Sequence, residues 1–267
     1  IMKISLSVIL ILFFFNYSFS GDVNNDELIS LAVENKYRKT NNKSRDKYRH
    51  PIETLSFFGL SREKKILEIT PGRGWYTEIL ANYMRNTNNY YVAKYDPPQF
   101  AVDIITKIQN EFEKYFLKNE NKFGKIKYIS INQDYKIVSK KNEFDIVLTF
   151  RNSHNWLDRG KAEKIYSSIY RSMKKGGILG VVQHRADESS PFNYKGGYVK
   201  ESFLINFIEN QGFKLINKSE INSNLKDTKN YEKGVWTLPP TYRLGEKDKS
   251  KYSKIGESDR MTLKFIK

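Results

Sequence analysis

Apolar and polar positions follow two different periods along most of the chain. Short apolar runs, typical of buried strands, cover residues 64–70, 89–96, 125–131, 144–150 and 177–184. Between them lie longer segments in which apolar residues recur every three or four positions, as on one face of a helix. These segments span residues 75–86, 101–117, 159–175 and 200–211. Strands that alternate with helices predict a doubly wound α/β sheet whose strands are mostly parallel.

The segments at the two ends of this pattern do not show the alternation of strand and helix. Residues 21–60 contain two short helical patterns, the second opened by Pro51 and closed by Gly59, and predict an N-terminal helical extension. The last two strands, 213–220 and 260–266, are separated by an irregular insertion at residues 222–258. This pair predicts an antiparallel edge strand. The fold class we expect is therefore a Rossmann-like doubly wound sheet, with residues 151–158 forming a loop after the fourth strand.

The first residues have the three parts of a secretory signal peptide. Lys3 precedes an apolar run from Ile4 to Phe15, and the small residues Ser18 and Ser20 stand three and one positions before Gly21. We therefore expect a signal peptide at residues 1–20, cleaved after Ser20, and a periplasmic or exported protein. The run is shorter than the roughly 20 residues that a spanning helix needs. Without cleavage, the same segment would act as a membrane anchor.

Composition narrows the possible partners. The chain has 267 residues, no cysteine and a formal net charge of +16. Without cysteine there is no disulfide framework and no thiol nucleophile. The lysines are scattered, and no nucleic-acid-binding module is visible, so we expect no nucleic-acid partner. We also expect no metal, since the three histidines lack local ligand spacing.

The turn after the first strand, in the stretch ILEITPGRGWYTEIL (residues 66–80), is rich in glycine. Ligands of open α/β sheets bind beyond the carboxyl ends of the strands. Gly72 and Gly74 allow a ligand close to the backbone, and Glu68 offers a hydrogen-bond acceptor. Asp96, at the end of the second strand, is placed to bind both hydroxyls of a ribose. Alternatively, the glycines only turn the chain and Asp96 caps the next helix.

The turn does not match the loops that bind dinucleotides or nucleoside triphosphates. Trp75 and Tyr76 follow Gly74, and Thr77 stands where a dinucleotide-binding loop has its third glycine. There is also no Lys-Ser or Lys-Thr pair, as a P-loop requires. A ligand without a pyrophosphate suits this turn better, which favours S-adenosylmethionine.

The turn and the sequence YDPP at residues 95–98 resemble motif I and the strand-two acid of class I S-adenosylmethionine-dependent methyltransferases. More narrowly, the chain resembles a family of predicted exported bacterial methyltransferases through stretches such as FRNSHNW, VVQHRA, VWTLPPTYR and IGESDRMTLKF. The resemblance covers about residues 45–267 and implies a methyltransferase-like domain at 61–267. It implies S-adenosyl-L-methionine as cofactor, held by Glu68, Thr70, Gly72, Gly74, Trp75, Tyr76 and Asp96. Thr70 stands where the superfamily usually has the first glycine of the motif.

The polar stretch after the fourth strand is the candidate for the chemistry. In class I methyltransferases this point faces the methyl group. His154 is a candidate general base, and Arg151 or Asn152 could orient the substrate or hold an anion. The alternative is a helix-capping loop anchored in the core by Trp156.

Other polar residues gather near the same edge of the predicted sheet. Candidates for substrate binding are His50, His184, Arg185, Glu257, Asp259 and Arg260. Arginines there could bind an acidic group of the substrate, although structural salt bridges and an ion-paired turn would explain them as well.

These observations predict transfer of a methyl group from S-adenosylmethionine to a small-molecule acceptor. One observation favours a second hypothesis: S-adenosylmethionine is made in the cytosol, and an exported enzyme would need a supply of it. The alternative is an exported, non-catalytic binding protein that uses the methyltransferase fold for another ligand.

Overall fold

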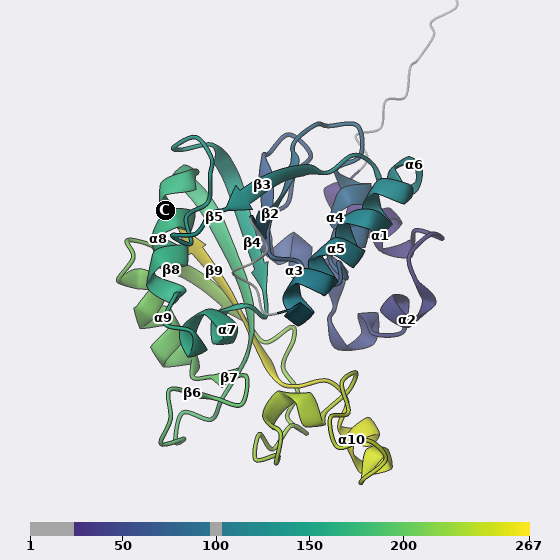
Figure 1. Cartoon of the computed structure of the whole chain (residues 1–267), viewed down its shortest axis with the longest axis vertical. Coiled ribbons are helices and arrows are strands. Elements are labelled where there is room, and N and C mark those ends of the chain that lie inside the picture. The colour runs from purple at the N-terminus through teal and green to yellow at the C-terminus, as the bar shows by residue number, and fades with distance from the viewer. Residues whose placement is uncertain (1–23, 97–102) are drawn as a thin grey trace, which may run out of the picture.

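The computed structural model describes residues 24–96 and 103–267, so the predicted signal peptide lies outside it. Its centre is a seven-stranded sheet with the order β3-β2-β1-β4-β5-β9-β8 (Figure 1). Strands β1 to β5 are parallel, and β9 runs antiparallel to β5 and β8. The strands are β1 (Ile66–Ile69), β2 (Tyr90–Tyr95), β3 (Lys127–Ile131), β4 (Phe144–Phe150), β5 (Met173–His184), β8 (Lys214–Ser219) and β9 (Arg260–Ile266). The predicted fold class is confirmed, with β9 one position inside the edge strand β8.

Helices cover both faces of the sheet (Figure 1). One face packs against α8 (Ala162–Ser172) and α9 (Glu201–Glu209), and the other against α1 (Asn25–Glu34), α3 (Pro51–Phe58), α4 (Thr77–Tyr83) and α5 (Asp103–Lys118). Side chains of β1 alternate between the two cores: Ile66 belongs to one, and Leu67 to the other. Burial on both faces explains why the strands read as continuous apolar runs.

The short helices α2 (Thr40–Lys43) and α6 (Glu120–Phe123) and the 3₁₀ helix η1 (Asp46–Tyr48) complete the N-terminal half. Both ends of α3 lie where the sequence predicts them, because Pro51 occupies its first turn and Gly59 adopts a left-handed conformation just after its last residue. The predicted N-terminal helical extension thus consists of α1, α2, η1 and α3, and it packs on α4 through α1.

The predicted loop at residues 151–158 is wrong for most of its length, because Ser153–Asp158 form the short helix α7. Ser153 and Trp156 are buried and hold this helix against α8: the Ser153 hydroxyl lies 2.7 Å from the Tyr166 hydroxyl, and the Trp156 ring meets the Tyr166 ring edge-on. The small hairpin of β6 (Tyr194–Lys195) and β7 (Tyr198–Val199) was also missed, since two-residue strands have no detectable period.

The insertion at residues 222–258 contains the 3₁₀ helix η3 (Gly234–Thr237) and α10 (Lys249–Ile255). His184, the last residue of β5, pairs with Arg260, the first residue of β9. The insertion therefore joins β9 at the carboxyl ends of the parallel strands, and Figure 1 shows α10, β6 and β7 beyond that end of the sheet. Arg260 Nη1 also donates a hydrogen bond to the carbonyl of Tyr48 in η1, which ties this end to the N-terminal helices.

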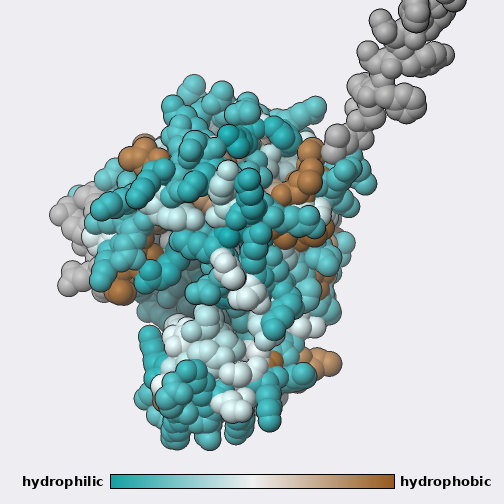
Figure 2. Space-filling model, turned by 90° about the vertical axis from the view of Figure 1, so that its right-hand side faces the viewer, coloured by the Kyte–Doolittle hydropathy of each residue, from teal (hydrophilic) through white to brown (hydrophobic). Residues whose placement is uncertain are grey.

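The face of the molecule in Figure 2 is mostly hydrophilic, with a few separate hydrophobic patches. Of the helices formed by the described residues, none has the length and apolar character that crossing a membrane requires.

Candidate active site at the carboxyl ends of β1, β2 and β4

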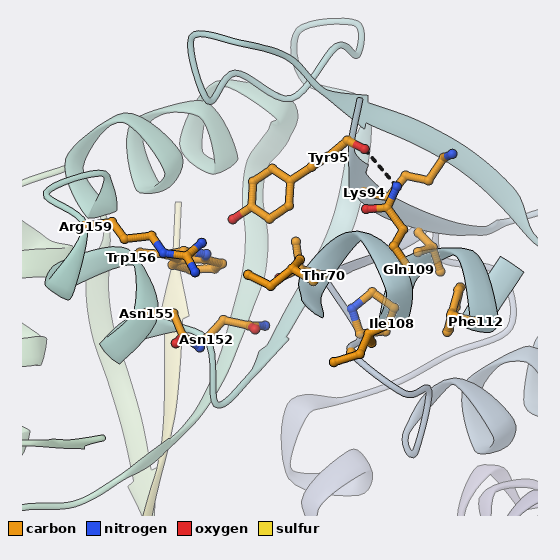
Figure 3. Close-up of a pocket in the computed structure, with 14 residues that line it drawn as sticks. Thr70, Lys94, Tyr95, Ile108, Gln109, Phe112, Asn152, Asn155, Trp156 and Arg159 are labelled. Carbon is orange, nitrogen blue, oxygen red and sulfur yellow. Dashed lines mark hydrogen bonds between the residues drawn. The ribbon is translucent and has the colours of Figure 1, made fainter. Parts of the chain in front are cut away.

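A pocket of about 170 Å³ opens where β1, β2 and β4 end, beside α5 and α7 (Figure 3). The strand order reverses between β1 and β4, so the pocket lies at the position where open α/β sheets bind ligands. Its walls are mostly apolar or aromatic, with a few polar groups. The lining residues are Thr70, Pro71, Gly72, Val92, Lys94, Tyr95, Ile105, Ile108, Gln109, Phe112, Asn152, Asn155, Trp156 and Arg159.

The glycine-rich turn supplies the floor of the pocket. Thr70 has a positive φ of 42°, and its Oγ1 is buried without a hydrogen-bond partner among the described residues. A Cβ atom on Gly72 would meet nothing within 4 Å, so the backbone is open to a ligand there. A Cβ atom on Gly74 would instead lie 2.6 Å from Phe116 and 2.9 Å from Phe112. Gly72 therefore leaves room for a ligand, while Gly74 lets α5 pack against the turn.

Five predicted cofactor residues are not among those that line the pocket: Glu68, Gly74, Trp75, Tyr76 and Asp96. Glu68 is buried beneath the turn and accepts hydrogen bonds from Thr77 Oγ1 (2.8 Å) and the Tyr90 hydroxyl (2.5 Å). Burial raises the pKa of Glu68 to about 7, although both hydrogen bonds lower it. Trp75 and Tyr76 are 5% exposed and pack against the N-terminal helices, where Trp75 Nε1 donates to the carbonyl of Asn42 (2.8 Å).

Asp96, the predicted ribose acid, directly follows the pocket residue Tyr95. Asp96 is exposed and accepts a hydrogen bond from Ser130 Oγ (2.8 Å) at the end of β3. It therefore lies at the end of β2, next to a residue that lines the pocket but not in the lining itself, with its second carboxylate oxygen in no hydrogen bond among the described residues. The segment 97–102, which follows it, lies outside the described residues.

Helix α5 forms a wall of the pocket that the sequence pattern did not assign. Ile105, Ile108, Gln109 and Phe112 have helical spacing and share one face. Gln109 Nε2 donates to the carbonyl of Tyr95 (2.9 Å; Figure 3) and so fixes α5 against the end of β2. The periodicity of this helix could have identified the wall, because Gln109 is a polar residue within its apolar face.

The loop after β4 reaches the pocket through Asn152 rather than through His154. Asn152 Nδ2 donates to the carbonyl of Ile69 (3.0 Å) and to Thr149 Oγ1 (3.1 Å), which ties the end of β4 to the end of β1. Trp156 lines the pocket and is also 2% exposed, so it belongs to the pocket wall and to the core.

The structure brings together His154 and His184, whose ring centres are 5.5 Å apart. Gln183 Nε2 lies 3.2 Å from His154 Nδ1, and Ser258 Oγ lies 2.5 Å from His184 Nδ1. Burial lowers the pKa of His154 to about 4 against the opposing effect of the Gln183 hydrogen bond, and the charge of Arg151 lowers it further. The pKa of His184 is also lowered, by burial first and then by His154 and Arg151. Both rings are therefore neutral at neutral pH.

Beside the two histidines lies a group of arginines, which we call the arginine cluster: Arg45, Arg49, Arg151 and Arg260. Glu257 binds Arg45 Nε (2.5 Å), Arg49 Nε (3.0 Å) and Arg260 Nη2. Burial alone would raise the pKa of Glu257, but the charges of Arg260, Arg49 and Arg45 together bring it well below the usual range. Glu257 is thus a permanent anion.

The other predicted substrate residues are placed differently. Arg185 and Asp259 pair with each other (3.0 Å), and Arg185 also contacts Glu201 and Glu220. These two residues belong to a separate network rich in carboxylates. His50 lines a second hollow, of about 310 Å³, together with Glu257 and Ser258. Within residues 24–96 and 103–267, no three His, Cys, Asp or Glu side chains gather as a metal site would need.

Solved structures with the same fold include methyltransferases and a cyclase. A SAM-dependent methyltransferase from Aquifex aeolicus is 16% identical over 67% of this chain and 87% of its own, with a TM-score of 0.54. The glycopeptide N-methyltransferase MtfA, solved with sinefungin, is 12% identical over 80% and 83% of the two chains (TM-score 0.52). The [4+2]-cyclase SpnF is 13% identical over 82% and 80% (TM-score 0.55).

At these identities the similarity establishes the fold: this chain has the class I methyltransferase fold. No family profile and no curated protein sequence matches the chain.

Proposed function

We propose that the protein binds S-adenosylmethionine in the pocket at the ends of β1, β2 and β4, and transfers its methyl group to a small-molecule acceptor. The observation that carries the proposal is the pocket itself, at the reversal of strand order, with the glycine-rich turn on one side and Asp96 directly after its lining residue Tyr95. Methyltransferases of the same fold, one of them solved with sinefungin, support it.

The residues present fit this cofactor. The buried hydroxyl of Thr70 has no partner among the described residues, and such a group is expected to gain one from a ligand. Gly72 leaves space above the turn, where the amino-acid end would bind, and Asp96 is available for the ribose hydroxyls. The apolar walls from α5 and Trp156 suit an adenine ring.

The sulfonium group of the cofactor supplies an activated methyl group, so the protein mainly has to align the acceptor with it. Asn152 holds the ends of β1 and β4 together and thereby fixes the loop that carries Arg151 and His154. His154 is neutral at neutral pH, but it does not line the pocket, so Asn152 is the predicted residue of this loop that lies where an acceptor would meet the cofactor.

A second candidate function keeps the pocket but not the methyl transfer. The [4+2]-cyclase SpnF has the same fold, and its chemistry differs from methyl transfer, so the fold alone does not decide the reaction. Formation of S-adenosylhomocysteine from bound S-adenosylmethionine distinguishes the two candidate functions, because a non-catalytic binding protein would retain the cofactor unchanged.

The test is calorimetric titration of residues 21–267 with S-adenosylhomocysteine. We expect micromolar binding, and we expect Gly72→Asn to weaken it about tenfold or more, because the new side chain occupies the space above the turn. Asparagine tolerates a positive φ, so the change adds little backbone strain.

The matched control is Gly245→Asn. Gly245 has a φ of 64°, close to the 61° of Gly72, and it lies on the exposed surface of the insertion. A Cβ atom on Gly245 would also meet nothing within 4 Å. This variant should bind S-adenosylhomocysteine as the parent does. Absence of binding to the parent chain at millimolar ligand would refute the proposal.

A further inference from the structure

The arginine cluster contains more positive charge than its surroundings neutralise. Three guanidinium groups pair with a single carboxylate, that of Glu257, and the fourth, Arg151, is near enough for the Glu257 charge to affect it. In the part of the chain that the structure describes, no other carboxylate lies within ion-pair distance of Arg45, Arg49, Arg151 or Arg260. In the Arg185 network the charges balance, because Glu201, Glu220 and Asp259 are matched by Arg185, Lys218 and Lys229. The surplus of positive charge is therefore a property of the arginine cluster and not of the neighbouring Arg185 network.

Two arginines of the cluster are buried, the other two are half-buried, and three of the four are incompletely hydrogen-bonded. Arg49 and Arg260 are 2% and 3% exposed. Arg45 Nη2, Arg49 Nη2 and Arg260 Nε are buried without hydrogen-bond partners, as is Nδ1 of the adjacent His50. These are four of the seven such side-chain atoms found in the described residues, so the polar atoms without partners concentrate here. Buried donors without acceptors are costly, and folded proteins retain few of them.

Arg151 is the member of the cluster with no ion-pair or hydrogen-bond partner for its side chain among the described residues. Its backbone has a φ of 61°, a conformation that non-glycine residues seldom adopt. Burial lowers its pKa to about 10, and the charges of Arg260 and Arg45 lower it as well, while Glu257 raises it. The side chain therefore stays charged at neutral pH, at a position that the surrounding charges make unfavourable.

No arginine of the cluster lines either hollow of the active-site end, but residues next to the cluster line both. Arg151 directly precedes Asn152, which lines the pocket beneath α5, and Glu257 lines the second hollow together with His50 and Ser258. Lys47, Lys226 and Lys254 are exposed at this second hollow, and Glu257 is the only acidic residue among the described ones that line it. Such a rim attracts anions toward the cluster.

We infer that the cluster binds an anionic group, a carboxylate or a phosphate, of the methyl acceptor, with Arg151, Arg49 and Arg260 as its donors. The inference rests on the proposed function and adds to it the chemical class of the acceptor. The carboxylate of S-adenosylmethionine suits the cluster poorly, because the sulfonium and ammonium groups of that molecule outweigh its one negative charge. An anionic acceptor neutralises the surplus and is drawn toward the sulfonium as well.

Inorganic phosphate is the probe for this site. Calorimetric titration of residues 21–267 with phosphate, at constant ionic strength set with sodium chloride, should show saturable binding to the parent chain. Arg151→Gln should weaken phosphate binding about tenfold or more, since it removes a charge-assisted contact. Arg151→Lys, which keeps the charge, should retain more of the affinity than Arg151→Gln.

Stability distinguishes binding from a structural role. Arg151 makes no ion pair with the described residues, and its charge opposes those of Arg260 and Arg45. Arg151→Gln should therefore leave the midpoint of thermal unfolding unchanged or raise it, in phosphate-free buffer. A lower midpoint would mean that Arg151 supports the fold, and would overturn its assignment as a ligand. Arg171→Gln is the control, because Arg171 is exposed at the end of α8.

The same titration, repeated with saturating S-adenosylhomocysteine, separates the acceptor from the cofactor. Independent or stronger phosphate binding supports an acceptor site. Competition between the two ligands would assign the cluster to the cofactor's carboxylate and overturn the inference, as would equal losses in Arg171→Gln and Arg151→Gln, or no phosphate binding to the parent chain. Phosphate binding without any S-adenosylhomocysteine binding would refute the proposed function while leaving the anion site standing.

Discussion

At the active-site end, burial gives single residues pKa values that differ from those of the same residues in water. Glu68 is the clearest example, because burial under the turn raises its pKa to about 7, whereas an ordinary Glu has a value of 4.5. His154 shows the opposite effect of burial, since the charged form of a histidine is the protonated one. These two residues make the stability of the protein depend on pH in opposite directions.

The pH dependence from Glu68 has a definite sign. Between pH 4.5 and 7 the unfolded carboxyl loses its proton while the folded one keeps it, so the free energy of unfolding falls as the pH rises through this window. Glu68→Gln removes the titration and keeps an oxygen for the Thr77 and Tyr90 donors. Relative to the parent, the variant should therefore gain stability with rising pH, by roughly 3 kcal/mol at most.

Urea unfolding of both proteins at pH 4.5 and pH 8 measures this difference. The buried His154 stabilises the fold increasingly as the pH rises from about 4 to 6.5, because the unfolded ring binds the proton more tightly. That effect is present in the parent and in the variant, so it cancels in the comparison. A difference that stays constant with pH would show that Glu68 titrates normally in the folded protein.

Sequence alone identified residues whose role depends on local chemistry, and missed those whose role depends on distant neighbours. Thr70 and Gly72 stand out within one turn, and both line the pocket. Trp75 follows in the same stretch, yet it turns toward Arg49 and Arg38 of the N-terminal segment, which lie over its ring. Its orientation is determined by a segment about 25 to 40 positions earlier, which local spacing does not reveal.

At the scale of elements, the turn between β1 and α4 and the helix α5 form one packed unit. Gly74 has a φ of 77°, and the rings of Phe112 and Phe116 fill the space where a side chain would be. Phe112 also lines the pocket, so the packing of this turn determines the shape of the wall.

Gly74→Ala should destabilise the protein by about 2–4 kcal/mol, from the strain of a positive φ and from overpacking against Phe112 and Phe116. Gly72→Ala has the same kind of strain but meets nothing within 4 Å, so we expect it to cost about 1–2 kcal/mol. Urea unfolding of the two variants gives both values. Equal losses would show that Phe112 and Phe116 move aside at little cost.

Most long elements could be predicted from the sequence because their periods are strong. The apolar runs of β1, β4 and β5 and the spacing in α5, α8 and α9 are visible without a structure. Helix α7 was missed because it has six residues and a polar sequence, and its helical state depends on Ser153 and Trp156 packing against α8. Short elements of this kind are decided by tertiary contacts rather than by propensity.

At the scale of the whole molecule, the order of the strands determines where the chemistry can lie. The parallel strands bring together three separate parts of the chain: the turn after β1, the acid after β2 and the loop after β4. The antiparallel β9 then returns Glu257 and Arg260 to the same end as Arg45 and Arg49, more than 200 positions earlier. The arginine cluster forms only when β9 joins the sheet. Its four residues can be found in the sequence, but their proximity cannot.

The formal charge of +16 acquires a more specific meaning in the structure. Scattered surface lysines account for most of it, and Figure 2 shows the hydrophilic surface that they help to form. In the arginine cluster beside the candidate active site, Arg49 and Arg260 are buried, and Arg45 and Arg151 are half-buried. It is the buried charges that carry information about a ligand, because a surface charge is solvated in any case.

The most direct test of the proposed cofactor site is a crystal structure of residues 21–267 with S-adenosylhomocysteine. We predict the nucleoside in the pocket of Figure 3, with the ribose hydroxyls on Asp96, the adenine between α5 and Trp156, and the homocysteine over Gly72 beside Thr70 Oγ1. A nucleoside bound elsewhere, or an Asp96 carboxylate turned away from the ribose, would contradict it.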